Sequence, residues 1–255
     1  MLTNSLLLTI VLSSNLIIGI LLGMSGISGF LLPLIYVGFL DIPVHDALAL
    51  SFLAFAVSGI LGAYSYWKSK NMDLKLALFL SIGSLPGAFL GVQINVLISD
   101  FLAKLLLYLF ILLAGLSIIF KKNNENTLIT KSKALNHPII VVMIGFLTAT
   151  ICALTGAGGP ILLVPLLVNL GVNIRVAVGV SLLNSVFIAI PSIFGYFAYA
   201  NVESMYGLVI TSLIGVTIGI LAGTRLANKV PMNLLKIMIA IITILSSLYM
   251  LFTLK

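Results

Sequence analysis

The chain has 255 residues, of which 61% are hydrophobic and only 7% carry a charged side chain. A soluble domain carries about 25% charged residues, so this composition excludes a water-covered surface and predicts a chain embedded in lipid. The net charge of +7 does not indicate a nucleic-acid partner, because the charges lie in short segments between apolar runs, and cytoplasmic loops are rich in Lys and Arg. The single cysteine, Cys152, excludes a disulfide framework and a cysteine-based metal cluster.

Each half of the chain begins with an apolar segment that is too long for one membrane crossing. Residues 5–40 are interrupted by SGISG at 25–29, and residues 138–174 by TGAGGP at 155–160. A straight helix of about 36 residues would span roughly 54 Å, whereas the hydrocarbon core is about 30 Å thick. We therefore expect a helical hairpin broken at its glycines in each half. The first run is also too long for a cleaved signal peptide, so we expect it in the mature protein.

Three uninterrupted apolar spans follow each hairpin, and each is long enough for a membrane helix. They are 47–67, 76–98 and 104–120 in the first half, and 176–199, 205–224 and 236–253 in the second. Aromatic residues fall near the ends of these spans, which predicts an interfacial belt formed by Tyr64, Tyr66, Trp67, Tyr196 and Tyr199. The polar segment 121–137 is predicted to be a cytoplasmic linker between membrane repeat 1 (1–120) and membrane repeat 2 (138–255).

The two halves are related by an internal duplication. At an offset of 130 residues the matched pairs include Gly26 and Gly156, Gly29 and Gly159, Ser51 and Ser181, Tyr66 and Tyr196, and Asn71 and Asn201. At an offset of 132 they continue with Gly83, Gly87 and Gly91 against Gly215, Gly219 and Gly223. Apolar composition alone would match Leu with Ile, but it would not produce this series of Gly, Ser, Tyr and Asn. The glycine series is also typical of close helix packing.

The loop charges indicate how the two repeats are oriented. If each hairpin crosses the membrane twice, each half has five crossings, and the halves have opposite orientations. The 13 basic residues then divide 11 to 2 between the cytoplasmic and outer sides, with only Lys104 and Lys255 outside. If each hairpin crosses once, the division is 8 to 5. The excess of positive charge on the cytoplasmic side favours the first arrangement. We therefore predict an all-α, polytopic integral membrane protein of eight to ten crossings in two inverted repeats, in a prokaryotic inner membrane.

The order of these motifs resembles one known family. The first half contains the glycine break followed by ALALS and GILGAYSYWKSKNMD, and the second contains TGAGGPILLVP, AVGVS, IFGYFAYANVE and GVTIGILAGTRLA. Over nearly the whole chain they resemble the TauE/SafE family of sulfite and organosulfonate exporters, also called the 4-toluene sulfonate uptake permease family. The resemblance implies an inner-membrane permease for small sulfur oxyanions, without fixing the substrate. The chain departs from the family pattern at the first break, where Ser28 stands opposite Gly158.

The two glycine breaks are the predicted substrate site. Lipid offers no hydrogen-bond partners, so an interrupted backbone persists only where protein or a water-filled cavity satisfies it. The N-terminus of the helix that begins at Pro160 carries a positive partial charge and suits an anion. Two such ends from opposite repeats would form one anion site near the midplane. The candidate substrate-binding residues are Ser25, Gly26, Ser28, Gly29, Ser51, Thr155, Gly156, Gly158, Gly159, Ser181 and Asn184. The alternative is that these glycines only allow close helix packing.

The distribution of ionisable residues bears on the reaction class. Every Asp and Glu lies in a loop or at the end of a span, which disfavours an enzyme, a cation carrier and a proton relay inside the membrane. Asp41, His45 and Asp46 share a short segment, but their spacing fits no structural zinc pattern, so no metal or cofactor is expected. We expect secondary transport of sulfite or an organosulfonate, with export favoured. The alternatives are an uptake permease or channel for another small solute, such as an inorganic anion, and a membrane enzyme or assembly subunit. A homo-oligomer is compatible with the sequence.

Overall fold

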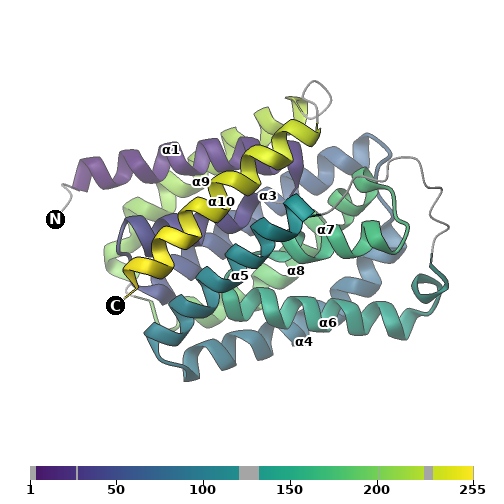
Figure 1. The fold of residues 1–255 in the computed structure, drawn as a ribbon, viewed down its shortest axis with the longest axis horizontal. Helices are drawn as coiled ribbons and strands as arrows, with labels where there is room; N and C mark the ends of the chain where they lie inside the picture. Colours follow the sequence, from purple (N-terminus) through teal and green to yellow (C-terminus); the bar gives the residue numbers. More distant parts are fainter. Residues whose placement is uncertain (1–3, 27, 121–131, 201, 227–231, 255) are drawn as a thin grey trace.

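The structure, a computed structural model, describes residues 4–26, 28–120, 132–200, 202–226 and 232–254 (Figure 1). Every regular element in these ranges is helical. The helices are α1 (Asn4–Ser25), η1 (Ser28–Phe30), α2 (Leu31–Leu34), η2 (Ile35–Phe39), α3 (Val44–Lys68), α4 (Leu74–Leu97), α5 (Asp100–Phe120), η3 (Lys133–Asn136), α6 (Pro138–Thr155), α7 (Gly159–Asn169), α8 (Ile174–Phe197), α9 (Val202–Leu226) and α10 (Met232–Thr253).

Seven of the described helices are long and apolar enough to cross a membrane, namely α1, α3, α4, α5, α6, α8 and α9. Three shorter apolar helices cover Ser28–Phe39, Gly159–Asn169 and Ile237–Thr253. These findings confirm the predicted all-α, polytopic membrane protein. The range of eight to ten crossings is reached only when the shorter helices are counted.

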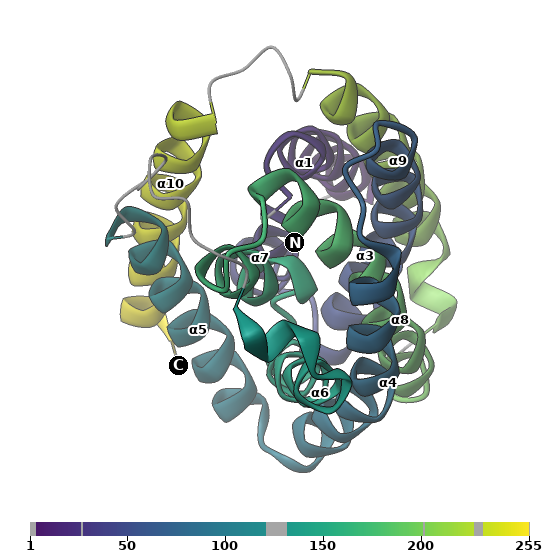
Figure 2. The same ribbon diagram turned by 90° about the vertical axis from the view of Figure 1, so that its right-hand side faces the viewer.

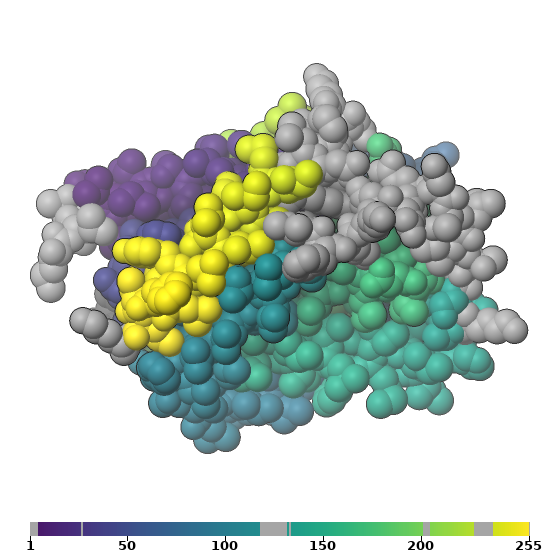
Figure 3. Space-filling model, in the orientation of Figure 1, coloured from purple at the N-terminus to yellow at the C-terminus, as the bar shows by residue number. Residues whose placement is uncertain are grey.

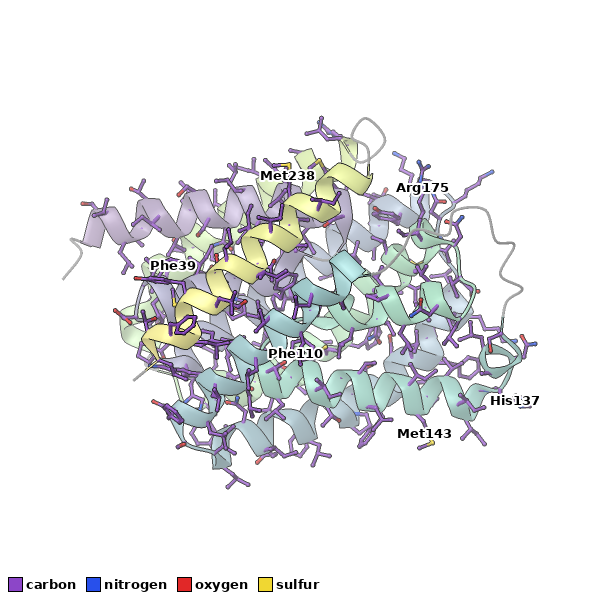
Figure 4. All side chains as sticks on the ribbon, in the orientation of Figure 1. Phe39, Phe110, His137, Met143, Arg175 and Met238 are labelled. Carbon is purple, nitrogen blue, oxygen red and sulfur yellow. The ribbon has the colours of Figure 1, made fainter. Side chains whose placement is uncertain are left out.

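Each predicted hairpin is present as a long helix, a glycine break and a short helix. Residues Ser28–Phe39 follow α1, and α7 follows α6. Phe39 lies at the end of the molecule from which α1 starts, whereas His137 and Arg175, which flank the second hairpin, lie at the opposite end (Figure 4). Each hairpin therefore returns to the end at which it began. A short arm of about 11 residues is roughly 16 Å long, so it reaches about halfway through a 30 Å hydrocarbon core.

The most extensive helix contacts all join one half of the chain to the other. α1 packs on α9 and α4 on α6, while α3 packs on α8 and α9, α4 on α8, and α5 on α10. In the view along the bundle, α5 and α10 form one flank, and α4, α8 and α9 form the opposite one (Figure 2). Residues from both ranges, 1–120 and 138–255, contribute to each of the two buried hydrophobic clusters.

The glycine series of α4 and α9 explains the closest of these contacts. A Cβ atom at Gly87 would collide with the carbonyl oxygen of Phe146 in α6, and one at Gly219 would lie 2.5 Å from the carbonyl oxygen of Leu16 in α1. Under the repeat offsets, Gly87 corresponds to Gly219 and Leu16 to Phe146. The two helix pairs therefore approach in the same way, and only glycine allows this distance between backbones.

The outer surface is largely apolar, as a bilayer requires. Large hydrophobic side chains are exposed on α4, α5, α6, α9 and α10, including Phe89, Leu113, Met143 and Phe252. One face of the molecule shows α10 lying beside α5 with α6 below them (Figure 3). An exposed apolar surface of this extent is stable in lipid but not in water.

One open groove lies where loops of the two halves meet. It has a volume of about 540 Å³ and is lined by Trp67, Met72, Asp73, Leu74, Gly171, Val172, Asn173 and Val176. Asp73 accepts a hydrogen bond from the backbone N–H of Leu76 (3.0 Å), and Asn173 accepts one from that of Arg175 (2.9 Å). These side chains cap α4 and α8, so both loops are fixed by the helices that follow them.

Candidate functional site

The second break begins where α6 ends at Thr155. Gly156 has a φ of +72° in the left-handed region, which ends the helix and favours glycine. The last carbonyl groups of a helix lack partners within it, and lipid cannot supply them. Here the hydroxyl of Tyr196 donates to the carbonyl of Ala153, and the amide of Asn95 donates to that of Leu154, both at 2.7 Å. Side chains from α8 and α4 therefore stabilise the broken end of α6.

This role corrects the predicted interfacial belt. Tyr64, Trp67 and Tyr199 are more than half exposed, as such a belt requires, but Tyr196 is completely buried and Tyr66 is 8% exposed. Tyr196 is instead a hydrogen-bond donor in the interior, next to the break. The sequence did not distinguish it from the others, because all of them lie near the end of an apolar span.

The first break has a related backbone. Gly26 follows α1 with a φ of +73°, and its N–H donates to the carbonyl of Leu22 at 2.7 Å. A Cβ atom at Gly26 would collide with Val178 of α8, and one at Gly156 would collide with Leu48 of α3. Positions 48 and 178 are themselves partners at the 130-residue offset. Each break therefore packs against the long helix that follows the hairpin of the opposite half, α8 for the first break and α3 for the second.

The two breaks meet at one cavity. Gly29 from the first break and Gly158 from the second line it together, along with Leu22, Phe30, Phe55, Ser58, Ala157, Pro160, Ile161, Leu182 and Ser185. Its volume is about 10 Å³, which is room for about one water molecule. None of these lining residues carries a formal charge. The cavity lies beside the start of α7, whose first turn contains Pro160.

Only Gly29 and Gly158 of the eleven predicted site residues line this cavity. The predicted hydroxyls of Ser25, Ser51 and Thr155 donate to carbonyls one turn earlier in their own helices, each at 2.7 Å. Ser28 reaches the carbonyl of Ile18 at 3.5 Å. Gly26, Gly156 and Gly159 contact side chains of α3 or α8. For those three glycines the geometry favours the packing interpretation.

Ser181 and Asn184 form a second polar group, on the part of α8 that contacts α4. Both are completely buried. The oxygen of the Asn184 side chain accepts from Ser84 at 2.8 Å and from Ser81 at 3.4 Å. Its Nδ2 atom and the Oγ atom of Ser181 have no hydrogen-bond partner among the described residues. A buried donor left unpaired costs about 1–3 kcal/mol, so these groups are poised to donate to an oxyanion or a water molecule.

Several residues of the site were missed at the level of sequence. Ser185 lines the cavity and lies one position after Asn184, while Phe55 and Ser58 reach it from α3. Ser81 and Ser84 were visible as polar residues inside an apolar span. The spacing did not identify the cavity-facing side of α8, because Leu182 and Ser185 line the cavity whereas Ser181 and Asn184 do not.

Comparisons with known proteins agree with this architecture. The family model described as sulfite exporter TauE/SafE matches residues 11–250. The probable membrane transporter protein YdhB of Bacillus subtilis (strain 168) is 28% identical over 247 residues, covering 92% of this chain and 97% of the relative. The probable membrane transporter protein YjnA of the same organism is 25% identical over 247 residues, covering 92% and 96%. No solved structure matches the chain. Since the family model covers nearly all of the helical core, the chain belongs to the TauE/SafE family and is a multi-pass membrane transporter.

Proposed function

We propose that this transporter exports a small anion, sulfite or an organosulfonate, through the cavity between the two glycine breaks. One observation carries the proposal: Gly29 and Gly158, from equivalent breaks in the two halves, line the same buried space. The helix that starts at Gly159 contributes a positive partial charge beside that space. Backbone groups and neutral side chains can bind an oxyanion there without a permanent counter-charge.

The donors on α8 support an oxyanion as the substrate. Asn184 and Ser181 hold unpartnered donor groups in the interior, and they precede Ser185, which lines the cavity, by one and four residues. The present cavity admits about one water molecule, so transport requires it to widen. A movement of α8 relative to α3 and α4 would bring these donors into contact with the widened cavity.

The direction of transport follows from the electrical potential. A bacterial cell interior is negative, and moving one charge across the membrane is worth about 2.3 kcal/mol per 100 mV. Export of an anion is favoured by this free energy, whereas uptake is opposed by it and needs a coupled cation. The described spans hold no Asp or Glu near their middles to carry a proton. Export driven by the potential therefore needs the fewest additional groups.

Purified protein in proteoliposomes tests the proposal. Vesicles are loaded with sulfite, and a potassium diffusion potential makes the interior negative without a proton or sodium gradient. We expect sulfite efflux above that of protein-free vesicles, accelerated by the potential. An efflux rate that is independent of the potential but depends on a proton or sodium gradient would instead indicate a coupled permease. If sulfite, organosulfonates and sulfate all remain inside, the proposed substrate class is wrong.

A further inference from the structure

Phe55 of α3 lies between the two breaks. A Cβ atom at Gly29 would be 3.0 Å from its Cε1 atom, and a Cβ atom at Gly158 would be 3.1 Å from its Cε2 atom. These two carbon atoms are on opposite edges of the phenyl ring, so one edge faces each break. The side chain is 3% exposed and lines the cavity. The ring therefore occupies the space that separates the two halves of the proposed anion site.

The opposite half has no equivalent ring. At the 130-residue offset Phe55 corresponds to Ser185, and both side chains line the same cavity. One half thus contributes a phenyl ring, and the other contributes a hydroxymethyl group. This pair is therefore one of the positions at which the two halves differ around the cavity.

An aromatic column holds the ring in place. Phe52 meets Phe55 edge-on, with ring centroids 5.6 Å apart and planes at 88°. Phe52 is stacked on Tyr196 at 5.8 Å, and Tyr196 lies 6.2 Å from the ring of His45. Since the hydroxyl of Tyr196 is bound to the carbonyl of Ala153, the column is anchored to the end of α6. The position of the ring is thereby tied to the second break.

The next turn of α3 is packed closely against α8. A Cβ atom at Gly59 would be 2.7 Å from the carbonyl oxygen of Leu182 and 2.7 Å from Oγ of Ser185. The aromatic column on one side and this close contact on the other leave the ring little space. Room for an anion between the breaks therefore requires the ring to turn or α3 to move.

We propose that the Phe55 ring is the plug that closes the passage between the breaks, and that the space it vacates sets the largest anion that can pass. This inference rests on the proposed function for the identity of the anion and for its passage between the breaks, whereas the position of the ring between Gly29 and Gly158 does not depend on it. The edge of a phenyl ring carries a positive partial charge, so a displaced ring can remain beside an anion without repelling it. A ring that fills the site in the closed conformation can thus also select by size in the open one.

Transport selectivity is the first test. We compare efflux of sulfite and of the larger benzenesulfonate from proteoliposomes that contain the wild-type protein, Phe55→Ala or Phe110→Ala. Phe110 lies on α5 (Figure 4) and packs on the core. It is not among the residues that line the cavity, so it controls for the loss of an aromatic ring elsewhere. We expect Phe55→Ala to reduce the preference for sulfite by about tenfold or more, the discrimination typical of a shape-selective pocket, while Phe110→Ala retains it.

Thiol labelling tests the plug without any assumption about the substrate. Ser185→Cys is combined with Cys152→Ala, which removes the only native thiol, and the anionic reagent 2-sulfonatoethyl methanethiosulfonate is added to the purified protein. We expect slow labelling with Phe55 present and labelling at least about tenfold faster with Phe55→Ala, because accessibility controls the reaction of a thiol. Phe55→Leu, which keeps more of the buried volume, is expected to lie between the two.

The outcomes separate the plug from the proposed substrate. Faster labelling in Phe55→Ala, in a protein that moves neither sulfite nor benzenesulfonate, supports the plug and contradicts the substrate class. Sulfite export with labelling rate and selectivity unchanged by Phe55→Ala contradicts the plug. If Phe55→Ala does not fold, the same two measurements on Phe55→Leu decide, and wild-type values for both overturn the proposal.

Discussion

Gly158 and Gly159 are neighbours at the second break, but their backbones differ. Gly158 has φ +76° and ψ 146°, a conformation that side-chain-bearing residues rarely adopt. A Cβ atom there would also be 3.1 Å from the Phe55 ring. Gly159 is the first residue of α7, and a Cβ atom there would be 2.9 Å from Cδ1 of Ile188, the far end of a flexible side chain. Substitution by alanine should therefore have a larger effect at Gly158 than at Gly159.

We expect Gly158→Ala to lower the free energy of unfolding by about 1–3 kcal/mol, because the residue must keep a strained backbone, and to abolish anion efflux. Gly159→Ala should retain most of the stability and most of the anion efflux, because the side chain of Ile188 can adopt another rotamer. Thermal unfolding in detergent and efflux from proteoliposomes give the two readings. Equal behaviour of the two variants would show that the backbone conformation at Gly158 is unimportant for the site.

Asn184 is the residue on α8 whose loss should affect binding most directly. Its Nδ2 atom has no described partner, so Asn184→Ala removes a donor that is free for the anion. We expect KM for sulfite to rise about tenfold, equivalent to roughly 1.4 kcal/mol, with the amount of protein in the membrane unchanged. Ser192→Ala is the control, because Ser192 is buried in the same helix and donates to the carbonyl of Ile188. A lower melting temperature with unchanged KM would assign Asn184 a structural role.

At the scale of elements, the glycine series makes two helix pairs equivalent. Gly87 in α4 lies against the backbone of α6, and Gly219 in α9 lies against that of α1. A side chain at either position must push two backbones apart, and overpacking of this kind costs about 1–3 kcal/mol or more. The close approach is thus a property of the duplicated sequence and not of one helix.

Gly87→Val and Gly219→Val should therefore lower the melting temperature in detergent by similar amounts. Leu90→Val serves as the control, because Leu90 lies on α4 with 42% of its surface exposed. The smaller valine side chain does not push any neighbouring backbone away. A large loss for Gly87→Val with none for Gly219→Val would contradict the equivalence of the two pairs.

The helical elements were predictable from the sequence, and their faces were not. The span 47–67 became α3 at Val44–Lys68, and the span 76–98 became α4 at Leu74–Leu97, because uninterrupted apolar runs in lipid have few alternatives to helix. Both glycine breaks also lie where the sequence placed them. The cavity-facing side of α8 could not be predicted, because Ser181, Asn184 and Ser185 all lie within four residues of one another on a mostly apolar helix, and only Ser185 lines the cavity.

At the scale of the molecule, the most extensive helix contacts of each half are made with the other half. An isolated first half would expose the contact faces of α1 and α4, and an isolated second half would expose those of α6 and α9. Assembly of the cavity therefore requires both halves, as Gly29 and Gly158 illustrate. The inverted orientation of the repeats relative to the bilayer stays a prediction from the loop charges.

Reporter fusions test that orientation. A reporter fused after Asn71 should lie in the cytoplasm, and one fused after Asn201, a residue outside the described part of the structure, should lie on the outer side. The expectation follows from the 11 to 2 division of basic residues. Alkaline phosphatase and green fluorescent protein activities give the two readings. The same side for both fusions would contradict inverted repeats.

Trp67 is the only tryptophan of the chain, and it lines the groove in which a loop of the first half faces Val172 and Asn173 of the second. A single indole at such a place is a natural fluorophore. Its emission depends on the polarity of its surroundings, so a displacement of one half against the other should alter its wavelength or intensity. Opening of the transporter can therefore be followed by stopped-flow fluorescence in the unlabelled, unmodified protein.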